Sequence, residues 1–107
     1  MTDLSIAFAA DHPCGPGHFP GNPIIPGALL LSEVLARIAS DLKVDNIVWN
    51  INSAKFPRSV RPGDRVNIQY KSVAQHEVSF DCRVHEGKVL SGTARYQPAP
   101  DDKGTAL

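Results

Sequence analysis

A chain of 107 residues, of which 42% are hydrophobic, is long enough for one small domain with a modest core. Its eleven basic and eleven acidic residues cancel, so no overall field favours nucleic acid or an anionic membrane surface. No apolar run approaches the roughly 18 residues of a membrane span, and the N-terminus lacks the basic segment of a signal peptide. We therefore expect a cytoplasmic protein that neither binds nucleic acid nor spans a membrane.

The two cysteines stand far apart and show no metal-type spacing, so we expect free thiols. Cys82 alternates with Val78, Phe80 and Val84, which predicts a thiol in the core. Cys14 lies in a loop rich in glycine and proline, where a small loop residue is favoured over a nucleophile.

Leu4, Ile6 and Phe8 alternate with small residues, which predicts a short first strand. Residues 11–23 are then too dense in glycine and proline for a helix or a central strand. They predict a loop of defined shape, able to hold the side chain of His18 at a fixed place.

Pro26 and Gly27 begin a predicted helix that extends to about Lys43. Its apolar residues cover well over half of the circumference, which predicts a helix buried on most sides. They are Ala28, Leu29, Leu30, Leu31, Val34, Leu35, Ile38, Ala39 and Leu42. The remaining stripe is polar and consists of Glu33, Arg37, Ser40 and Asp41. Glu33 and Arg37 have the spacing and order that favour an exposed ion pair.

Only strand signals follow the helix. Strands are predicted over 47–56, 66–71, 78–84 and 88–96, with a turn over 57–64 and a tight hairpin turn at Glu86–Gly87. The last three strands are joined by short loops, so they form an antiparallel meander. The expected architecture is α+β, with about five antiparallel strands curled around one long central helix. Residues 1–97 form this single domain, and 98–107 are expected to be a disordered tail.

Two motifs in register resemble a known family. The stretch HFPGNPIIPGALLL, residues 18–31, resembles the signature HFPGxPxxPGxLxxE/D of the FabZ/FabA-type 3-hydroxyacyl-[acyl-carrier-protein] dehydratases. The stretch AKFPRSVRPGD, residues 54–64, resembles the turn ARFKRPVxPGD of the same family. The resemblance covers roughly residues 4–97 and implies the hotdog fold. The short segment before the loop is more similar to the compact dehydratase-like proteins of aryl polyene and other specialised lipid pathways.

The resemblance implies a lyase that acts on 3-hydroxyacyl thioesters in fatty-acid-type synthesis. His18 would be the general base that removes the α-proton, and the backbone amides of Gly27 and Ala28 would bind the thioester oxygen. An acidic residue on the helix of a second subunit would protonate the leaving hydroxyl. The family's site lies at the interface of a homodimer, uses no cofactor and no metal, and takes acyl carrier protein or coenzyme A thioesters.

The chain departs from the family at the position of the acid. Counted from His18, that position is Ser32, and Glu33 stands one residue, about 100° of helix rotation, away. A surface pair with Arg37 would explain Glu33, whereas a local shift of the helix start would turn it inward. Ser32 is a poor proton donor, and a missing acid costs about 10²–10⁴-fold in rate. The alternatives are a slow dehydratase, a heterodimer with another hotdog subunit, a non-catalytic subunit that binds acyl carrier protein, or an acyl thioesterase.

A basic cluster surrounds the second motif and consists of Lys55, Arg58, Arg61 and Arg65. A solvated turn would explain it, but in the family such a patch receives the acidic carrier protein and its phosphopantetheine phosphate. Phe19 and Phe56 are expected to pack around the site. His12 and His18 have no third ligand in suitable spacing for a metal. His76 and His85 are expected at solvated strand ends.

Overall fold

The computed structural model describes residues 2–9 and 24–100. Its elements are β1 (Thr2–Ala7), α1 (Gly27–Leu42), β2 (Ile47–Lys55), β3 (Arg65–Ala74), β4 (Glu77–Val84) and β5 (Gly87–Pro98). The predicted α+β architecture of one helix and five strands is therefore confirmed. The predicted loop residues His12, Cys14, His18 and Phe19, and residues 101–107 of the predicted tail, lie outside the described residues.

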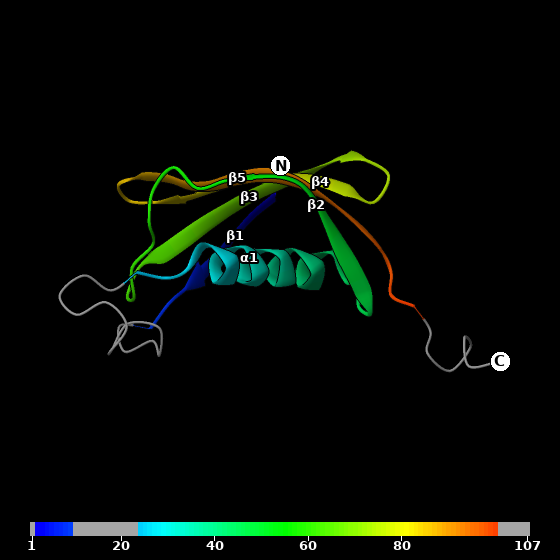
Figure 1. The fold of residues 1–107 in the computed structure, drawn as a ribbon, viewed down its shortest axis with the longest axis horizontal. Coiled ribbons are helices and arrows are strands. Elements are labelled where there is room, and N and C mark those ends of the chain that lie inside the picture. The colour runs from blue at the N-terminus through cyan, green and yellow to red at the C-terminus, as the bar shows by residue number, and fades with distance from the viewer. Residues whose placement is uncertain (1, 10–23, 101–107) are drawn as a thin grey trace.

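The five strands form one sheet in the order β1-β3-β4-β5-β2, and all neighbouring strands are antiparallel. The meander β3-β4-β5 fills its centre, as the short connections predict, so β1 and β2 become the two edges (Figure 1). The turn between β4 and β5 is formed by His85 and Glu86, one residue earlier than predicted. Val84 and Gly87 pair across this turn, and Gly87 has φ of 147°.

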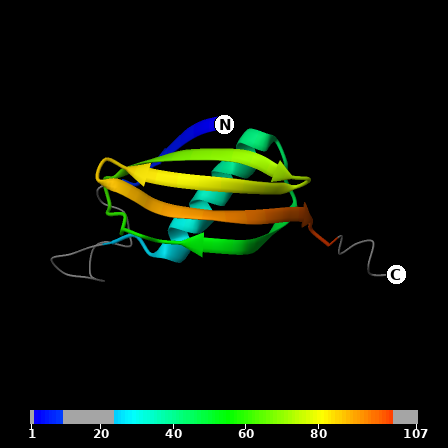
Figure 2. The same ribbon diagram turned by 90° about the horizontal axis from the view of Figure 1, so that it is seen from above.

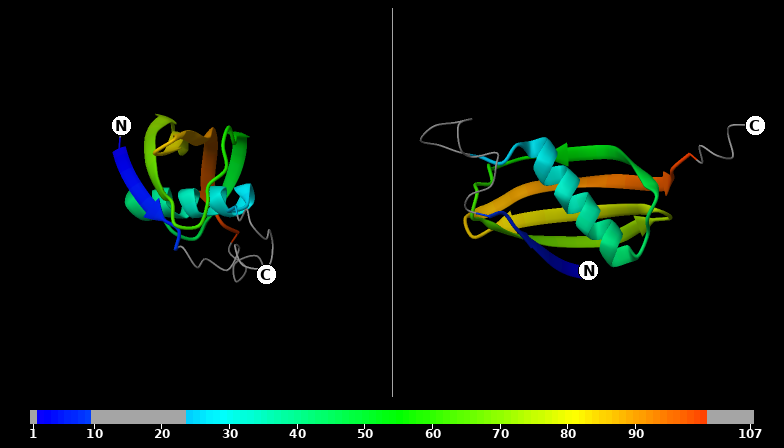
Figure 3. Two further views of the ribbon diagram at one scale, coloured as in Figure 1. Left: turned by 90° about the vertical axis from the view of Figure 1, so that its left-hand side faces the viewer. Right: turned by 90° about the horizontal axis from the view of Figure 1, so that it is seen from below.

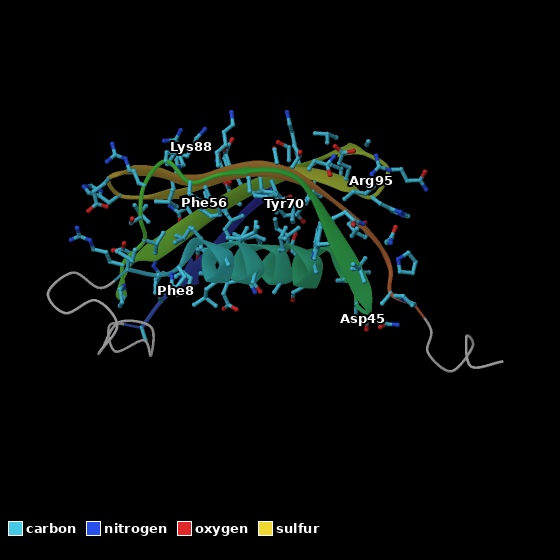
Figure 4. All side chains as sticks on the ribbon, in the orientation of Figure 1. Phe8, Asp45, Phe56, Tyr70, Lys88 and Arg95 are labelled. Carbon is cyan, nitrogen blue, oxygen red and sulfur yellow. The ribbon has the colours of Figure 1, made fainter. Side chains whose placement is uncertain are left out.

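Side chains alternate between the two faces of the sheet because successive residues of a strand point to opposite sides. The inner face carries Val66, Ile68, Tyr70, Val78, Phe80, Cys82, Leu90 and Ala94, all buried. The outer face is polar and carries the exposed ion pairs Lys88–Asp81 and Arg95–Glu77 (Figure 4). One dry and one wet face agree with the alternating sequence pattern.

The helix lies on the inner face and crosses the strands obliquely (Figures 2 and 3). It buries Leu30, Val34, Leu35 and Ile38. Leu29, Leu31 and Leu42 are only partly buried, so the prediction of burial on most sides is wrong within this single chain. One sheet can cover only one side of a helix, and residues 2–9 and 24–100 leave part of the opposite side exposed. No helix in the described part of the chain is long and apolar enough to cross a membrane.

The predicted turn at 57–64 connects edge strand β2 to β3 and contacts the segment before the helix. Ile25 forms an isolated bridge with Val60, and its N–H donates to the Val60 carbonyl at 2.7 Å. At the far end, Lys43 ends the helix in the left-handed region with φ of 61°. The Ala99 N–H donates to the Asn46 carbonyl at 2.8 Å, beyond the end of β5.

Candidate functional site

The first turn of α1 offers uncapped backbone donors. The helix begins at Gly27, and its first hydrogen bond runs from the Leu30 N–H to the Pro26 carbonyl at 3.0 Å. The amides before Leu30 therefore have no acceptor inside the helix. Pro26 stands at the N-cap and gives no side-chain hydrogen bond to them, and the first turn carries no acidic side chain. The helix dipole and these amides together favour a negatively charged or polarised oxygen at this point.

A small cavity of about 220 Å³ lies at this helix start. Its walls come from Ile24, Ile25, Gly27, Leu30 and residues 56–60. The Phe56 ring lies between the sheet and the start of α1 (Figure 4), and its edge contacts Gly27. A Cβ atom added at Gly27 would stand 3.2 Å from Phe56 Cε1. The lining is mixed, because Arg58 and Ser59 stand beside apolar side chains, and Phe56 forms part of the wall next to the first residue of α1.

A second cavity of about 530 Å³ adjoins the first, because Arg58 and Ser59 line both. Its other walls are Arg61, Asp64, Val84 and Glu86. Two guanidinium groups can bind a phosphate or carboxylate group with bidentate geometry. Asp64 and Glu86 balance the formal charges of Arg58 and Arg61, so this is a polar cavity with two arginines, and it adjoins the recess at the helix start.

Backbone contacts pin the turn that carries the two arginines. The Arg61 N–H donates to Asp64 Oδ2 at 2.9 Å, and the Asp64 N–H donates to the Arg61 carbonyl at 3.0 Å. Gly63 has φ of 95°, which favours glycine, and its N–H donates to the Phe8 carbonyl at 2.7 Å. Phe8 is buried next to β1, so the turn is fixed to the core.

The four basic residues predicted as a carrier-binding cluster do not all lie together. Arg58 and Arg61 line the same cavity, whereas Lys55 ends β2 and Arg65 begins β3, with β4 and β5 between them. Of the four residues, Arg58 and Arg61 are therefore the two that line the cavity.

Sequence reasoning missed Asp64 and Glu86, whose carboxylates line the cavity beside the arginines. Glu86 arrives there because the β4–β5 turn returns to the end of the sheet at which β3 begins. The predicted hairpins could have indicated this position of Glu86. Two successive antiparallel connections bring the start of β5 back to the end of the sheet at which β3 begins.

Ser32 and Glu33 both lie on exposed parts of α1, away from the buried residues Leu30 and Val34. Consecutive helical positions are about 100° apart, so the two side chains leave the helix on different sides of its exposed face. Both positions are open to a second chain that packs on this face.

The predicted ion pair between Glu33 and Arg37 is wrong. Within residues 2–9 and 24–100 the ion pairs are Lys88–Asp81 and Arg95–Glu77. Both side chains of the predicted pair are exposed, where such a contact contributes little and costs side-chain entropy. The exposure of Glu33 still agrees with a surface residue, so the ion pair alone is lost from that interpretation.

Three further predictions concern the thiol of Cys82, the two histidines at strand ends and a metal site. Cys82 is a buried free thiol, as predicted, and burial raises its pKa to about 12. His76 and His85 are exposed, in agreement with the prediction. Among the described residues, no group of three His, Cys, Asp or Glu side chains could hold a metal ion. His18, the predicted base, lies outside these residues.

The chain matches the family model of ApeI-like dehydratases over residues 1–93. It is 32% identical over 99 residues to the 3-hydroxyacyl-[acyl-carrier-protein] dehydratase FabZ of Psychrobacter arcticus, covering 81% of this chain and 68% of that protein. It is 40% identical over 93 residues to FabZ of Aliarcobacter butzleri, covering 76% of this chain and 61% of that protein. The chain spans about half to two thirds of the length of the curated relatives that it matches.

Solved structures share the fold. An uncharacterised protein from Erwinia carotovora superposes with a TM-score of 0.74 at 22% identity, covering 90% of this chain and 82% of that one. The dehydratase heterocomplex ApeI:P from Xenorhabdus doucetiae gives a TM-score of 0.71 at 19% identity, covering 88% and 84%. These similarities, together with the family model, confirm the predicted hotdog fold.

Proposed function

This chain belongs to the ApeI-like family of dehydratases, and from that premise we propose that it dehydrates 3-hydroxyacyl thioesters in fatty-acid-type synthesis. The reaction breaks a C–H bond at the α-carbon and the C–O bond at the β-carbon, forms a double bond between these carbons, and releases water. The observation that carries the proposal is the start of α1, whose first amides have no acceptor inside the helix and which borders a small recess next to the polar cavity of Arg58 and Arg61.

The helix start supplies the electrostatic part of the mechanism. Removal of the α-proton shifts negative charge onto the thioester oxygen, and the amides of Gly27 and Ala28 are donors without an intrahelical acceptor. His18 is the proposed base, and the motif HFPGNPIIPG, which joins it to this helix start, supports that role. No cofactor takes part in the proposed reaction.

The acid is proposed to come from the exposed face of α1 in a second subunit. Ser32 occupies the family's acid position, and Glu33 is the adjacent carboxylate without the predicted Arg37 partner. The exposure of both residues supports completion of the site by another chain.

The second candidate function is that of a partner-dependent or non-catalytic hotdog subunit, and Ser32 is the specific observation that favours it. In that case another subunit supplies the acid, or this chain only binds acyl chains. A heterocomplex is named for the structural neighbour from Xenorhabdus doucetiae. An acyl thioesterase is the third alternative, since His18 could also activate water.

Edge strand β2 is the proposed surface for the second subunit. Its Val48 and Ile51 are 39% and 42% exposed, although large apolar side chains gain free energy by leaving water. The free edge of β2 also offers unpaired backbone groups to another strand. We propose a homodimer through this edge, with a heterodimer as the alternative, acting in the cytoplasm.

One assay tests the proposed function. The hydration of a crotonyl thioester, which is the reverse reaction, is followed for the parent chain and for His18→Ala at high enzyme concentration. We expect turnover in the parent and a loss of about 10²–10⁴-fold in the variant. Absence of turnover in the parent alone, with turnover restored by a second hotdog subunit, would support the partner-dependent candidate instead. Full activity of His18→Ala would contradict the proposed mechanism.

A further inference from the structure

Phe56 is a large aromatic side chain with high solvent exposure. It follows the last residue of β2 and is 44% exposed. Burial of a phenylalanine stabilises a fold by about 1.5–3 kcal/mol relative to exposure, so much of this gain is not realised in the single chain. The ring nevertheless lies close to the first residue of α1.

The ring and Gly27 are sterically matched. A Cβ atom at residue 27 would lie 3.2 Å from Cε1 and 3.4 Å from Cδ1 and Cζ of Phe56. The absence of that atom lets the ring edge approach the helix backbone at the point where the uncapped amides begin. Gly27 has helical geometry, so the space next to Phe56, rather than backbone strain, is what its missing side chain provides.

The ring also marks the boundary between the two cavities. Phe56 lines the recess of about 220 Å³ together with Gly27 and Leu30, but it does not line the polar cavity of about 530 Å³. Arg58, two residues later, lines both. A ligand with an anionic group at Arg58 would therefore meet the aromatic ring as it approaches the helix start.

From these contacts we propose that Phe56 forms the wall against which the thioester group packs while its oxygen accepts hydrogen bonds from Gly27 and Ala28. This inference rests on the proposed function. An aromatic ring accepts no ordinary hydrogen bond from the amides, so it excludes water without occupying the donors. Electrostatic stabilisation by those donors increases when water is excluded. The ring thereby orients the thioester and strengthens its polarisation.

Two measurements test this role of Phe56: NMR detects contact between the ring and a bound substrate analogue, and the hydration assay gives the rate. The probe is the stable amide analogue of crotonyl-pantetheine, added to the isotope-labelled full chain and observed by NMR. We expect shifts of the Gly27 and Ala28 amides and nuclear Overhauser contacts between the Phe56 ring and the crotonyl protons. In the hydration assay we expect kcat to fall by about 10–100-fold in Phe56→Ala and less in Phe56→Leu. Val73→Ala is the matched control, since Val73 is 47% exposed outside both cavities.

The outcomes are distinguishable. If the probe shifts the two amides without contacting the ring, or if Phe56→Ala is no slower than Val73→Ala, the role of Phe56 is overturned and the helix-start site stands. If the probe leaves both amides unshifted, the proposed oxyanion site fails and the role of Phe56 fails with it. Phe56→Leu keeps the test valid if Phe56→Ala does not fold.

Discussion

Tyr70 Oη donates a hydrogen bond to the Asp41 carboxylate and so ties the buried face of β3 to the last turns of α1. Tyr70 lies between sheet and helix (Figure 4) and is almost completely buried, whereas Asp41 is exposed. The contact satisfies a phenol that would otherwise lose its water partners on burial. The contact holds the C-terminal end of the helix against the sheet, whereas the candidate site lies at the N-terminal end of the same helix.

Removal of this hydroxyl should therefore weaken the fold without disturbing the candidate site. We expect Tyr70→Phe to lower the free energy of unfolding by about 1 kcal/mol, the usual net value of one hydrogen bond. Urea unfolding measures the change. The matched control is Tyr96→Phe, because the ring of Tyr96 packs on Trp49 and His76 and no hydrogen bond of its hydroxyl is present among the described residues. Equal losses in the two variants would contradict a specific role for the Asp41 contact.

Alkaline pH should destabilise the protein through two buried groups. Burial raises the pKa of Cys82 from 9.0 to about 12. Burial, assisted by Asp41, raises the pKa of Tyr70 from 10.0 to about 12. Between the pKa of each group in the unfolded chain and its raised pKa in the folded chain, the unfolded chain has released a proton that the folded chain still holds. The free energy of unfolding therefore falls as the pH rises.

This stability is fully present below about pH 9 and is lost progressively towards pH 12, with a slope of at most about 1.4 kcal/mol per pH unit for each group. Urea unfolding between pH 8 and pH 11 in reducing buffer measures the slope. Cys82→Ala should remove the loss that begins near pH 9 and leave the loss that Tyr70 causes from pH 10 upward. An unchanged profile in Cys82→Ala would show that the thiol does not contribute.

Gly92 should tolerate no side chain. A Cβ atom there would lie 2.1 Å from the Ser53 carbonyl oxygen, which belongs to the backbone of β2 at its bulge. We expect Gly92→Ala to lower the free energy of unfolding by about 2–3 kcal/mol or more, because backbone rather than a flexible side chain must move. Ser91→Ala, the neighbouring position, should change it by less than about 0.5 kcal/mol. Thermal unfolding of both variants checks this, and a mild effect of Gly92→Ala would contradict the observed register of β2 against β5.

Local sequence patterns were sufficient to predict the helix and the strands. They were not sufficient to predict how the sheet packs against the helix. Alternation at Val78, Phe80 and Cys82 predicted a strand and a buried face because the side-chain period of a strand is two. The helix pattern could not reveal that one sheet covers only the side of Leu30 and Val34. That outcome depends on how far the sheet curls, which no single segment encodes.

The candidate site shows the same division. The start of the helix at Pro26 and Gly27 was predicted from a local signal, whereas the role of the first amides came from the family resemblance. The approach of Phe56 to Gly27, and of Glu86 to Arg58, depends on the register between strands distant in sequence. The expected pair of Glu33 and Arg37 was wrong because exposed side chains gain little from pairing.

Arg58 and Arg61 of the polar cavity should affect the binding of carrier-linked substrates rather than the chemical step. We expect Arg58→Ala and Arg61→Ala to raise the KM for an acyl-carrier-protein substrate by about tenfold, the value of one charge-assisted hydrogen bond. The KM for an N-acetylcysteamine thioester, which has no phosphate, should stay unchanged. Arg95→Ala is the control, because Arg95 is a basic residue on the outer face. A similar effect of Arg95→Ala would indicate general charge attraction instead of a phosphate site.

Ser32 and Glu33 decide whether this chain can act as its own acid. If Glu33 donates the proton, Glu33→Gln should lower kcat by about 10²-fold or more, because the amide cannot protonate a leaving hydroxyl. If the acid site at Ser32 is intact but unoccupied, Ser32→Asp should raise kcat by a similar factor. Arg37→Ala is the control for a change of charge on the same helix face, and hydration of the crotonyl thioester measures all three variants. Unchanged rates in both Glu33→Gln and Ser32→Asp would contradict an acid on this face of α1 and favour one supplied by a different subunit.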